Sequence, residues 1–225
     1  MLLLYSSGSG GSEGDKIPHQ PLICIQAECG IISQDRIQWG NMAKLADYSG
    51  EFDPKFSHDK LSKETLLRLL KAYFEYMRRI DAFWYATVMD RRGNDEAFNC
   101  DVMVWEKGLP YELRVISSLL GIHGDDVATV MKYLQVSPWM WIHEYEIDIK
   151  SSNHAVVTHF TCPILLAMEK EGKGREKLEC QELEPKVFRT IAHYFNPSIK
   201  VTGLKVPPRT SYSDVCCQWE YKLQR

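Results

Sequence analysis

The residues best suited to chemistry lie in the last third of the chain. Four of the seven cysteines fall there, interleaved with three histidines: Cys162, Cys180, Cys216 and Cys217 with His154, His159 and His193. Thiolates and imidazoles are the ligands that zinc prefers, and a thiolate is also a strong nucleophile. The sequence therefore favours either a metal site or thiol chemistry here, with small buried hydrophobic cysteines as the simpler alternative.

The metal hypothesis assigns zinc, the one cofactor we expect, to Cys162, Cys180 and a member of the pair Cys216 and Cys217. Neighbouring residues of a strand face opposite sides of the sheet, so only one of that pair can join a given site. A nearby histidine or glutamate would complete the tetrahedron that zinc requires. The spacings are long and contain no C-x-x-C pair.

The nucleophile hypothesis rests on Cys162, which directly precedes Pro163 at the expected start of a helix. A helix N-terminus lowers the pKa of a thiol and offers free N–H groups to a developing oxyanion. His159 lies three residues upstream and would be the general base. The competing interpretation is that Cys162 simply packs where a strand meets a helix.

Tryptophans provide a third signal. Trp84, Trp105, Trp141 and Trp219 could line an apolar pocket for a ring-bearing ligand. Tryptophans in a domain of this size are also commonly core residues.

The composition limits the class of protein. The chain has 225 residues, a formal net charge of −3 and 44% hydrophobic residues. No basic excess is present, so we expect no nucleic-acid partner, and no membrane partner is expected from the short leucine run at the start. Without an export signal we expect a cytoplasmic protein with reduced thiols, a small-molecule partner and self-association as an open option.

Three segments can be distinguished along the chain. Residues 1–20 are rich in glycine and serine and predict a flexible tail. Residues 21–60 form an N-terminal extension and linker without a sustained period. Residues 61–225 carry clear helical and strand patterns, and we expect them to form a single domain.

The first half of this domain has the helical period. Ser62 is placed to cap a helix that runs to Gly93. A second helix is expected to end at Gly108, and a third to run from Pro110 to Gly121. The segment 125–136 predicts a fourth.

The second half alternates strands and helices. Strands are expected over 141–149, 153–161, 199–206 and 214–223, with helices beginning at Pro163 and Pro185. The order predicts an α+β fold, helical in its first half, with a mainly antiparallel sheet and further helices in its second half.

Several short segments resemble a known family. They are "Cys162-Pro", "Glu179-Cys180", "Phe195-Asn-Pro", "Pro207-Pro208" and "Cys217-Gln-Trp-Glu-Tyr". Together with Asp81–Trp84 as D-x-x-W and Gly93–Ala97 as G-x-x-x-A, they look like an uncharacterised bacterial branch of the L-2-amino-thiazoline-4-carboxylic acid hydrolase-like proteins. The resemblance covers roughly residues 60–225. The further cysteine pair of that family is replaced here by "VTGLKV" before the prolines.

The resemblance implies a small-molecule enzyme that hydrolyses an amidine- or amide-type C–N bond of a small cyclic substrate. It would use Cys162 or a metal-bound water. The layout also resembles the sensor domains related to 4-vinyl reductases, which implies a metal-containing ligand-binding or sensor module without catalysis. Likeness at the level of the fold does not decide between these functions, and an interaction subunit is a third option.

Overall fold

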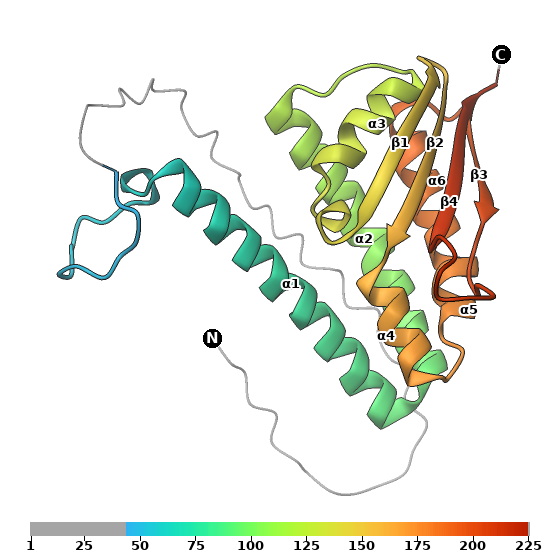
Figure 1. Ribbon diagram of the computed structural model, residues 1–225, viewed down its shortest axis with the longest axis horizontal. Helices are drawn as coiled ribbons and strands as arrows, with labels where there is room; N and C mark the ends of the chain where they lie inside the picture. Colours follow the sequence, from blue (N-terminus) through green and yellow to red (C-terminus); the bar gives the residue numbers. More distant parts are fainter. Residues whose placement is uncertain (1–43, 225) are drawn as a thin grey trace, which may run out of the picture. The chain divides into compact units, whose positions relative to one another are not determined.

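The computed structural model describes residues 44–224 (Figure 1). The expected tail 1–20, and the extension 21–60 as far as residue 43, lie outside the described residues. No helix in the described part of the chain is long and apolar enough to cross a membrane.

Helix α1, Lys63–Arg92, is bounded as its sequence predicts. The side chain of Ser62 accepts a hydrogen bond from the backbone N–H of Thr65, which satisfies one of the free donors at the helix start. Gly93 ends the helix with φ of 90°, a conformation that favours glycine.

Helix α2, Asn94–Leu120, replaces the two helices expected from the sequence. It passes through Gly108 and holds Pro110 inside. Proline removes one backbone hydrogen bond from a helix interior. Leu109 and Leu113 are only 4% and 0% exposed, so burial of this apolar face outweighs the local preference to stop. Gly121 ends the helix in the left-handed conformation with φ of 62°.

A four-stranded antiparallel sheet follows, in the order β1-β2-β4-β3. Along the chain its strands are β1, Glu144–Ser151, β2, His154–Thr161, β3, Ile199–Lys205, and β4, Cys217–Leu223. The first strand begins later than expected because Pro138–Ile142 forms a 3-10 turn, η2. The predicted α+β class, with helices first and an antiparallel sheet later, is confirmed.

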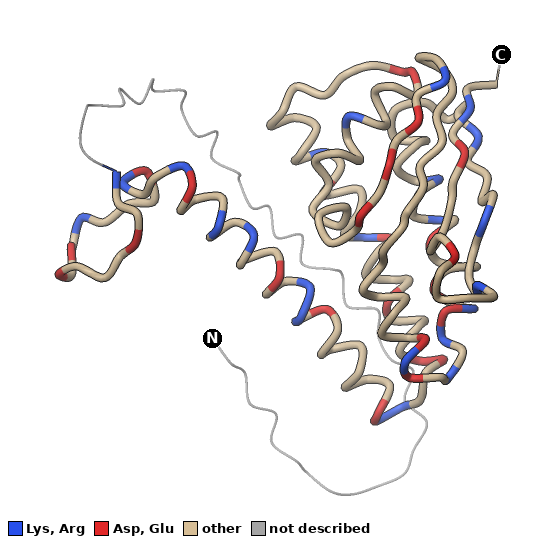
Figure 2. The backbone as a smooth tube through the Cα atoms, viewed as in Figure 1, with Lys and Arg blue, Asp and Glu red and all other residues tan. Residues whose placement is uncertain are grey.

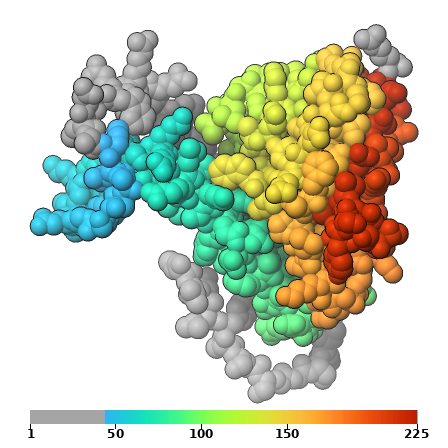
Figure 3. All heavy atoms as spheres, viewed as in Figure 1, coloured from blue at the N-terminus to red at the C-terminus, as the bar shows by residue number. Residues whose placement is uncertain are grey.

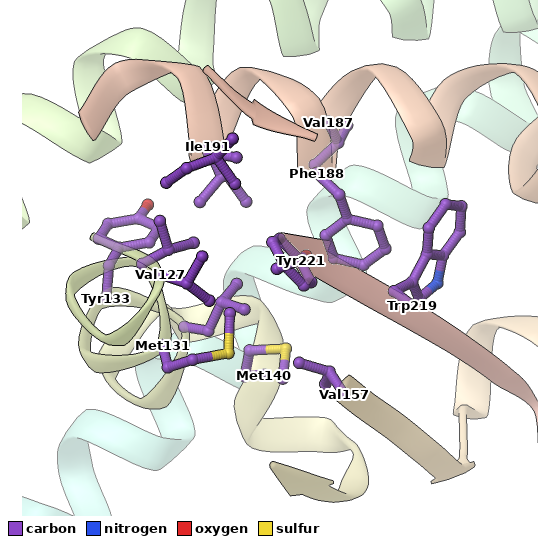
Figure 4. Close-up of a cluster of buried hydrophobic side chains, with 14 of the residues drawn as sticks. Val127, Met131, Tyr133, Met140, Val157, Val187, Phe188, Ile191, Trp219 and Tyr221 are labelled. Carbon is purple, nitrogen blue, oxygen red and sulfur yellow. The ribbon is translucent and has the colours of Figure 1, made fainter. Parts of the chain in front are cut away.

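One face of the sheet carries the core. Helices α3, Val127–Val136, and α6, Glu184–Phe195, pack on it, and α2 packs against these two helices. Figure 4 shows side chains of α3 and α6 near Val157 of β2 and Trp219 and Tyr221 of β4. The strand residues point inward at alternate positions, as the period of two requires.

Between β2 and α6 the chain forms three short pieces. Helix α4, Pro163–Glu171, begins where Pro163 predicts, with Cys162 as its N-cap. The segment then turns through α5, Glu176–Leu178, into a π-helix, η3, over Glu179–Leu183. Single π-helical turns are rare and occur most often at functional sites.

Candidate functional site

A cavity of about 210 Å³ lies where α1, α2, α4 and the π-helix meet. Its apolar wall includes Trp105 from α2, Trp139 from η2 and Tyr85 from α1. Carboxyl groups line the rest: Asp81, Asp101, Glu179 and Glu184. A second cavity of about 50 Å³ shares Trp105, Trp139, His143, Ile164 and Glu184 with it, so the hollow continues toward the core.

The aromatic wall is held in place by contacts behind it. The rings of Trp105 and Trp139 lie 4.9 Å apart between centroids, and Phe74 meets Trp139 edge to face at 5.9 Å. The Trp139 Nε1 donates to Glu112 Oε2 over 3.1 Å. Glu112 Oε1 also accepts from Tyr133 and Ser137 at 2.6 and 3.1 Å. The wall is therefore preorganised rather than formed on binding.

The carboxyl groups of the cavity repel one another. Burial, followed by the charges of Glu179, Asp81 and Glu184, raises the pKa of Asp101 to about 8. Burial, with Glu179 next, raises the pKa of Glu184 to about 7. Burial also raises the pKa values of Asp81 and Glu179. At neutral pH some of these groups therefore hold protons that a bound cation would displace.

Two arginines reach the cavity, but their charges are already matched. Arg78 forms a two-pronged pair with Glu75, at 3.0 and 2.7 Å. Arg175 lies 3.2 Å from Glu171 Oε2 and 3.8 Å from Glu179 Oε1, with its guanidinium 4.2 Å from the centre of the Tyr85 ring. Among the described residues, Asp81, Asp101 and Glu184 form no ion pair. The cavity thus has more carboxyl groups than cations that are free to pair with them.

One histidine lines the cavity with the carboxyl groups, and a second histidine packs against it. His143 lines the cavity and meets His159 edge to face at 4.9 Å between ring centroids. Within the described chain, all four ring nitrogens are buried and lack a hydrogen-bond partner. Burial lowers the pKa of His143 to about 4 and, with the charge of His143 as a second cause, that of His159 to about 3. Both are neutral at pH 7, so each ring has a nitrogen able to accept a hydrogen bond.

The π-helix supplies several of the side chains that line the cavity. Glu179, Cys180 and Leu183 all line it from this one segment, and Glu184 follows directly. Cys162 and Ile164 come from the start of α4 on another side. An extra residue in a helical turn changes the directions in which the neighbouring side chains point. Several side chains of this short segment can therefore line the same cavity wall.

The predicted cysteines lie in this neighbourhood. Cys216 is 2% exposed in a small apolar cluster with Leu165 and Met168, and Cys162 and Cys180 pack against that cluster. Cys217 begins β4 and points to the core face with Trp219. Burial raises the pKa of Cys162 to about 12 and raises those of Cys180 and Cys217 as well. These thiols are therefore protonated.

Two chemical roles expected of the cysteines find little support in this arrangement. No group of three or more Cys, His, Asp or Glu side chains in the described residues could hold a metal ion, so no step is derived through zinc. The Cys162 Sγ accepts from the backbone N–H of Leu165 at 3.4 Å, while both nitrogens of the expected base His159 lack a partner among the described residues. Cys162 therefore caps helix α4, and burial raises the pKa of its thiol rather than lowering it.

The other predicted residues have different surroundings. Trp105 lines the cavity, and Trp84 donates from Nε1 to Asp81 Oδ1 over 3.1 Å at its edge. Trp141 lines a separate groove beside α1, and Trp219 is 3% exposed in the core. His154 pairs with Glu220 at 2.9 Å on the outer side of the sheet.

Sequence reasoning missed Asp101 and Glu184, and it did not place Asp81 or Glu179 in a ligand cavity. Asp81 and Asp101 sit on helices at positions that otherwise face apolar neighbours, and Asp101 is 6% exposed. A charged residue within an apolar helix stripe is the signal that could have found them. Nothing local indicated that His143 and Glu184, 41 positions apart, share a wall.

The comparisons with known proteins give a family without a function. No curated protein and no solved structure matches the chain. Residues 58–223 match a family described as a family of unknown function, DUF6125. This range includes every residue of the cavity. The chain therefore belongs to the DUF6125 family.

Proposed function

We propose that this protein binds a small ring-bearing molecule with an amidine- or amine-type cation in the acidic aromatic cavity. The observation that carries the proposal is the excess of carboxyl groups over free cations in a partly buried cavity walled by Trp105 and Trp139. Such a site favours a ligand that is cationic at one end and flat and apolar at the other.

The hydrogen-bonding groups of the cavity fit the same ligand. Carboxylates only accept hydrogen bonds, and the neutral ring of His143 offers an acceptor nitrogen that lacks a partner in the described chain. An amidinium group presents several N–H donors in one plane. It would therefore pair with Asp101, Glu184 and His143 together, and would satisfy buried groups that are costly to leave unpaired.

Three probes of one shape test this proposal: benzamidine, benzamide and benzoate. We expect benzamidine to bind at least about tenfold more tightly than benzamide, measured by calorimetry and by tryptophan fluorescence, and benzoate to bind least. Asp101→Asn keeps the shape of the side chain and should weaken benzamidine binding. Glu146→Gln on the exposed face of β1 is the matched control and should leave binding unchanged. Equal binding of benzamidine and benzoate would overturn the proposal.

Binding should also depend on pH. A cation favours the ionised carboxylates, and Asp101 and Glu184, with pKa values of about 8 and about 7, must release protons first. The affinity for benzamidine is therefore expected to rise between pH 6 and pH 8.5, by up to roughly tenfold per pH unit for each proton released. Calorimetry in buffers of different ionisation enthalpy would count those protons. An affinity that does not change with pH would show that the cation does not bind next to Asp101 and Glu184.

Hydrolysis of the bound C–N bond is the second candidate function, in line with the resemblance to amino-thiazoline carboxylic acid hydrolase-like proteins. The observation in its favour is that two carboxyl groups of one cavity, Asp101 and Glu184, have pKa values raised to about 8 and about 7, so that near neutral pH one can be ionised while the other is protonated. The ionised member would take a proton from water as the water oxygen attacks the amidine carbon. The protonated member would then donate to the leaving nitrogen as the C–N bond breaks.

Release of ammonia or amine from cyclic amidines, including a 2-amino-thiazoline carboxylate, tests this candidate. Asp101→Asn should abolish turnover, whereas Cys162→Ser should retain most of it because burial keeps the thiol protonated and its sulfur caps helix α4. If Cys162→Ser alone abolished turnover, the nucleophile would be the thiol. Binding without turnover across the panel would favour a ligand-binding or sensor module.

A further inference from the structure

Helix α1 carries an apolar stripe with the spacing of a coiled coil. Six residues alternate at intervals of four and three, and we call them the α1 seam: Leu66, Leu70, Tyr73, Met77, Ile80 and Trp84. This average spacing of 3.5 residues keeps a stripe facing a second helix along its whole length. The four central members are 52, 56, 41 and 47% exposed, so within the described residues the seam is unpaired.

Two more aromatic residues widen the seam on one side. Tyr76 is 66% and Phe83 is 60% exposed. No charged residue interrupts the seam, whereas the charges of α1 lie at other positions of the helix, with both signs interspersed along it (Figure 2). Enrichment in aromatic residues and methionine with depletion of charge is typical of the centre of a protein–protein interface.

The seam is not the face that α1 uses within its own chain. The buried residues of the helix are Phe74 and Tyr85, which lie beside the seam around the helix axis. Phe74 packs on Trp139 and Trp141, with ring centroids 5.9 and 6.4 Å apart. Helix α1 contacts α2, and its atoms form part of the surface seen in Figure 3.

We propose that the α1 seam is the interface of a symmetric homodimer, in which α1 packs against α1 of a second copy. A stripe of this kind is complementary to itself, and a twofold dimer is the commonest assembly of identical chains. In an antiparallel arrangement centred near Glu75, Leu70 lies opposite Ile80 of the other copy, and Tyr73 opposite Met77.

The size of the surface agrees with such a dimer. From their exposed fractions, the central seam residues with Tyr76 and Phe83 present roughly 700 Å² per copy, close to the roughly 800 Å² per partner of a standard stable interface. Exposed apolar patches of this extent are uncommon on proteins that stay monomeric.

The seam also adjoins the cavity. Trp84 of the seam donates to Asp81, which lines the cavity together with Tyr85 from the next turn. Because α1 supplies this wall, fixing α1 in a dimer would also fix the wall. The dimer does not depend on what the cavity binds.

The test is the mass of the full chain in solution, by light scattering and sedimentation. The wild-type protein should be a dimer at micromolar concentration. The double variant Tyr73→Glu/Ile80→Glu should be monomeric, with dimerisation weakened by roughly thirtyfold or more, because it places charges in a desolvated seam. Leu119→Glu on α2, at 79% exposed an equally apolar surface site away from the seam, is the matched control and should remain dimeric.

Circular dichroism and thermal unfolding would confirm that the variants are folded. A wild-type monomer at about 100 μM would overturn the proposal. If that monomer also protected the backbone of α1 on the seam side from hydrogen exchange, another part of the same chain would be the occupant. A dimer that survives Tyr73→Glu/Ile80→Glu but dissociates with Leu119→Glu would move the interface to α2.

Discussion

Two polar regions of this protein lie on either side of Trp139, and they are built in opposite ways. Behind the tryptophan, the carboxylate of Glu112 accepts from Tyr133, Ser137 and Trp139, so each buried donor has its acceptor. In front of it, the cavity holds Asp101 and Glu184 with raised pKa values and a histidine without partners in the described chain.

Paired and unpaired buried polar groups have different effects on a protein. A matched network contributes to stability and fixes one arrangement of side chains. Unmatched carboxyl and imidazole groups cost stability, and they are retained where a ligand or a reaction uses them. The hydrogen bonds around Glu112 therefore hold the aromatic wall in place, and the cavity in front is the site that we propose binds a ligand.

Removing the matched acceptor should have the largest effect. Glu112→Ala leaves the Tyr133 and Ser137 hydroxyls and the Trp139 indole N–H without their acceptor. Because an unpaired buried donor costs about 1–3 kcal/mol, we expect a loss of about 3 kcal/mol or more in the free energy of unfolding, measured with urea. A loss below about 1 kcal/mol would show that water replaces the carboxylate readily.

The histidines should make the protein sensitive to acid. Their folded pKa values of about 4 for His143 and about 3 for His159 lie below the ordinary value of 6.5. The unfolded chain therefore binds protons that the folded chain does not, and stability falls as pH drops from 6.5 toward 4. Each group contributes up to about 1.4 kcal/mol per pH unit.

Urea unfolding of the wild type and of His159→Phe between pH 4 and 7 would measure this slope. The variant should show a shallower decline, while His154→Phe, at the sheet surface, serves as the control. Identical slopes in all three proteins would mean that His159 is solvated.

The cavity carboxyl Asp101 should oppose stability at higher pH. Its folded pKa of about 8 lies above the ordinary 3.8, so the folded chain holds a proton that the unfolded chain loses. Stability is therefore lost as pH rises from about 4 to about 8. Asp101→Asn removes this titration, so its free energy of unfolding should equal that of the wild type near pH 4 and exceed it increasingly above, by up to about 1.4 kcal/mol per pH unit as far as pH 8. A variant less stable at pH 8 would show that the carboxylate has a partner.

Metal removal should have the smallest effect. The cysteines near the cavity are buried and protonated, and no group of ligands in the part of the chain described by the structure could hold a metal. Treatment with a chelator is expected to move the melting temperature by less than about 2 °C, which corresponds to under 1 kcal/mol in a chain of this length. A large drop would show that zinc is bound and contributes to folding.

The sequence predicted much of the fold because the signals were local. The cap at Ser62, the stop at Gly93 and the helix start at Pro163 each depend on a few neighbouring residues, and all three agree with the structure. The signals at Gly108 and Pro110 were equally local but were overridden, because Leu109 and Leu113 gain more from burial in one continuous helix than the chain loses at the proline.

The candidate site was only partly accessible in this way. The sequence drew attention to Cys162, Cys180 and Trp105, which do reach the cavity. It could not show that burial leaves the thiols protonated, since a pKa depends on the surroundings that folding creates. It also gave no sign of the π-helix, because one extra residue in a helical turn has no reliable sequence pattern.

What the sequence by itself determined is the α+β architecture, the ends of most elements and the heptad spacing of α1, all of which follow from periodicity and short-range sterics. Only the tertiary structure decided that Asp101, Glu184 and His143 share one cavity and that the α1 seam is left unpaired within the described chain. Contacts between residues distant in sequence depend on how whole elements pack, and that packing minimises exposed apolar area over the entire core rather than at any one segment.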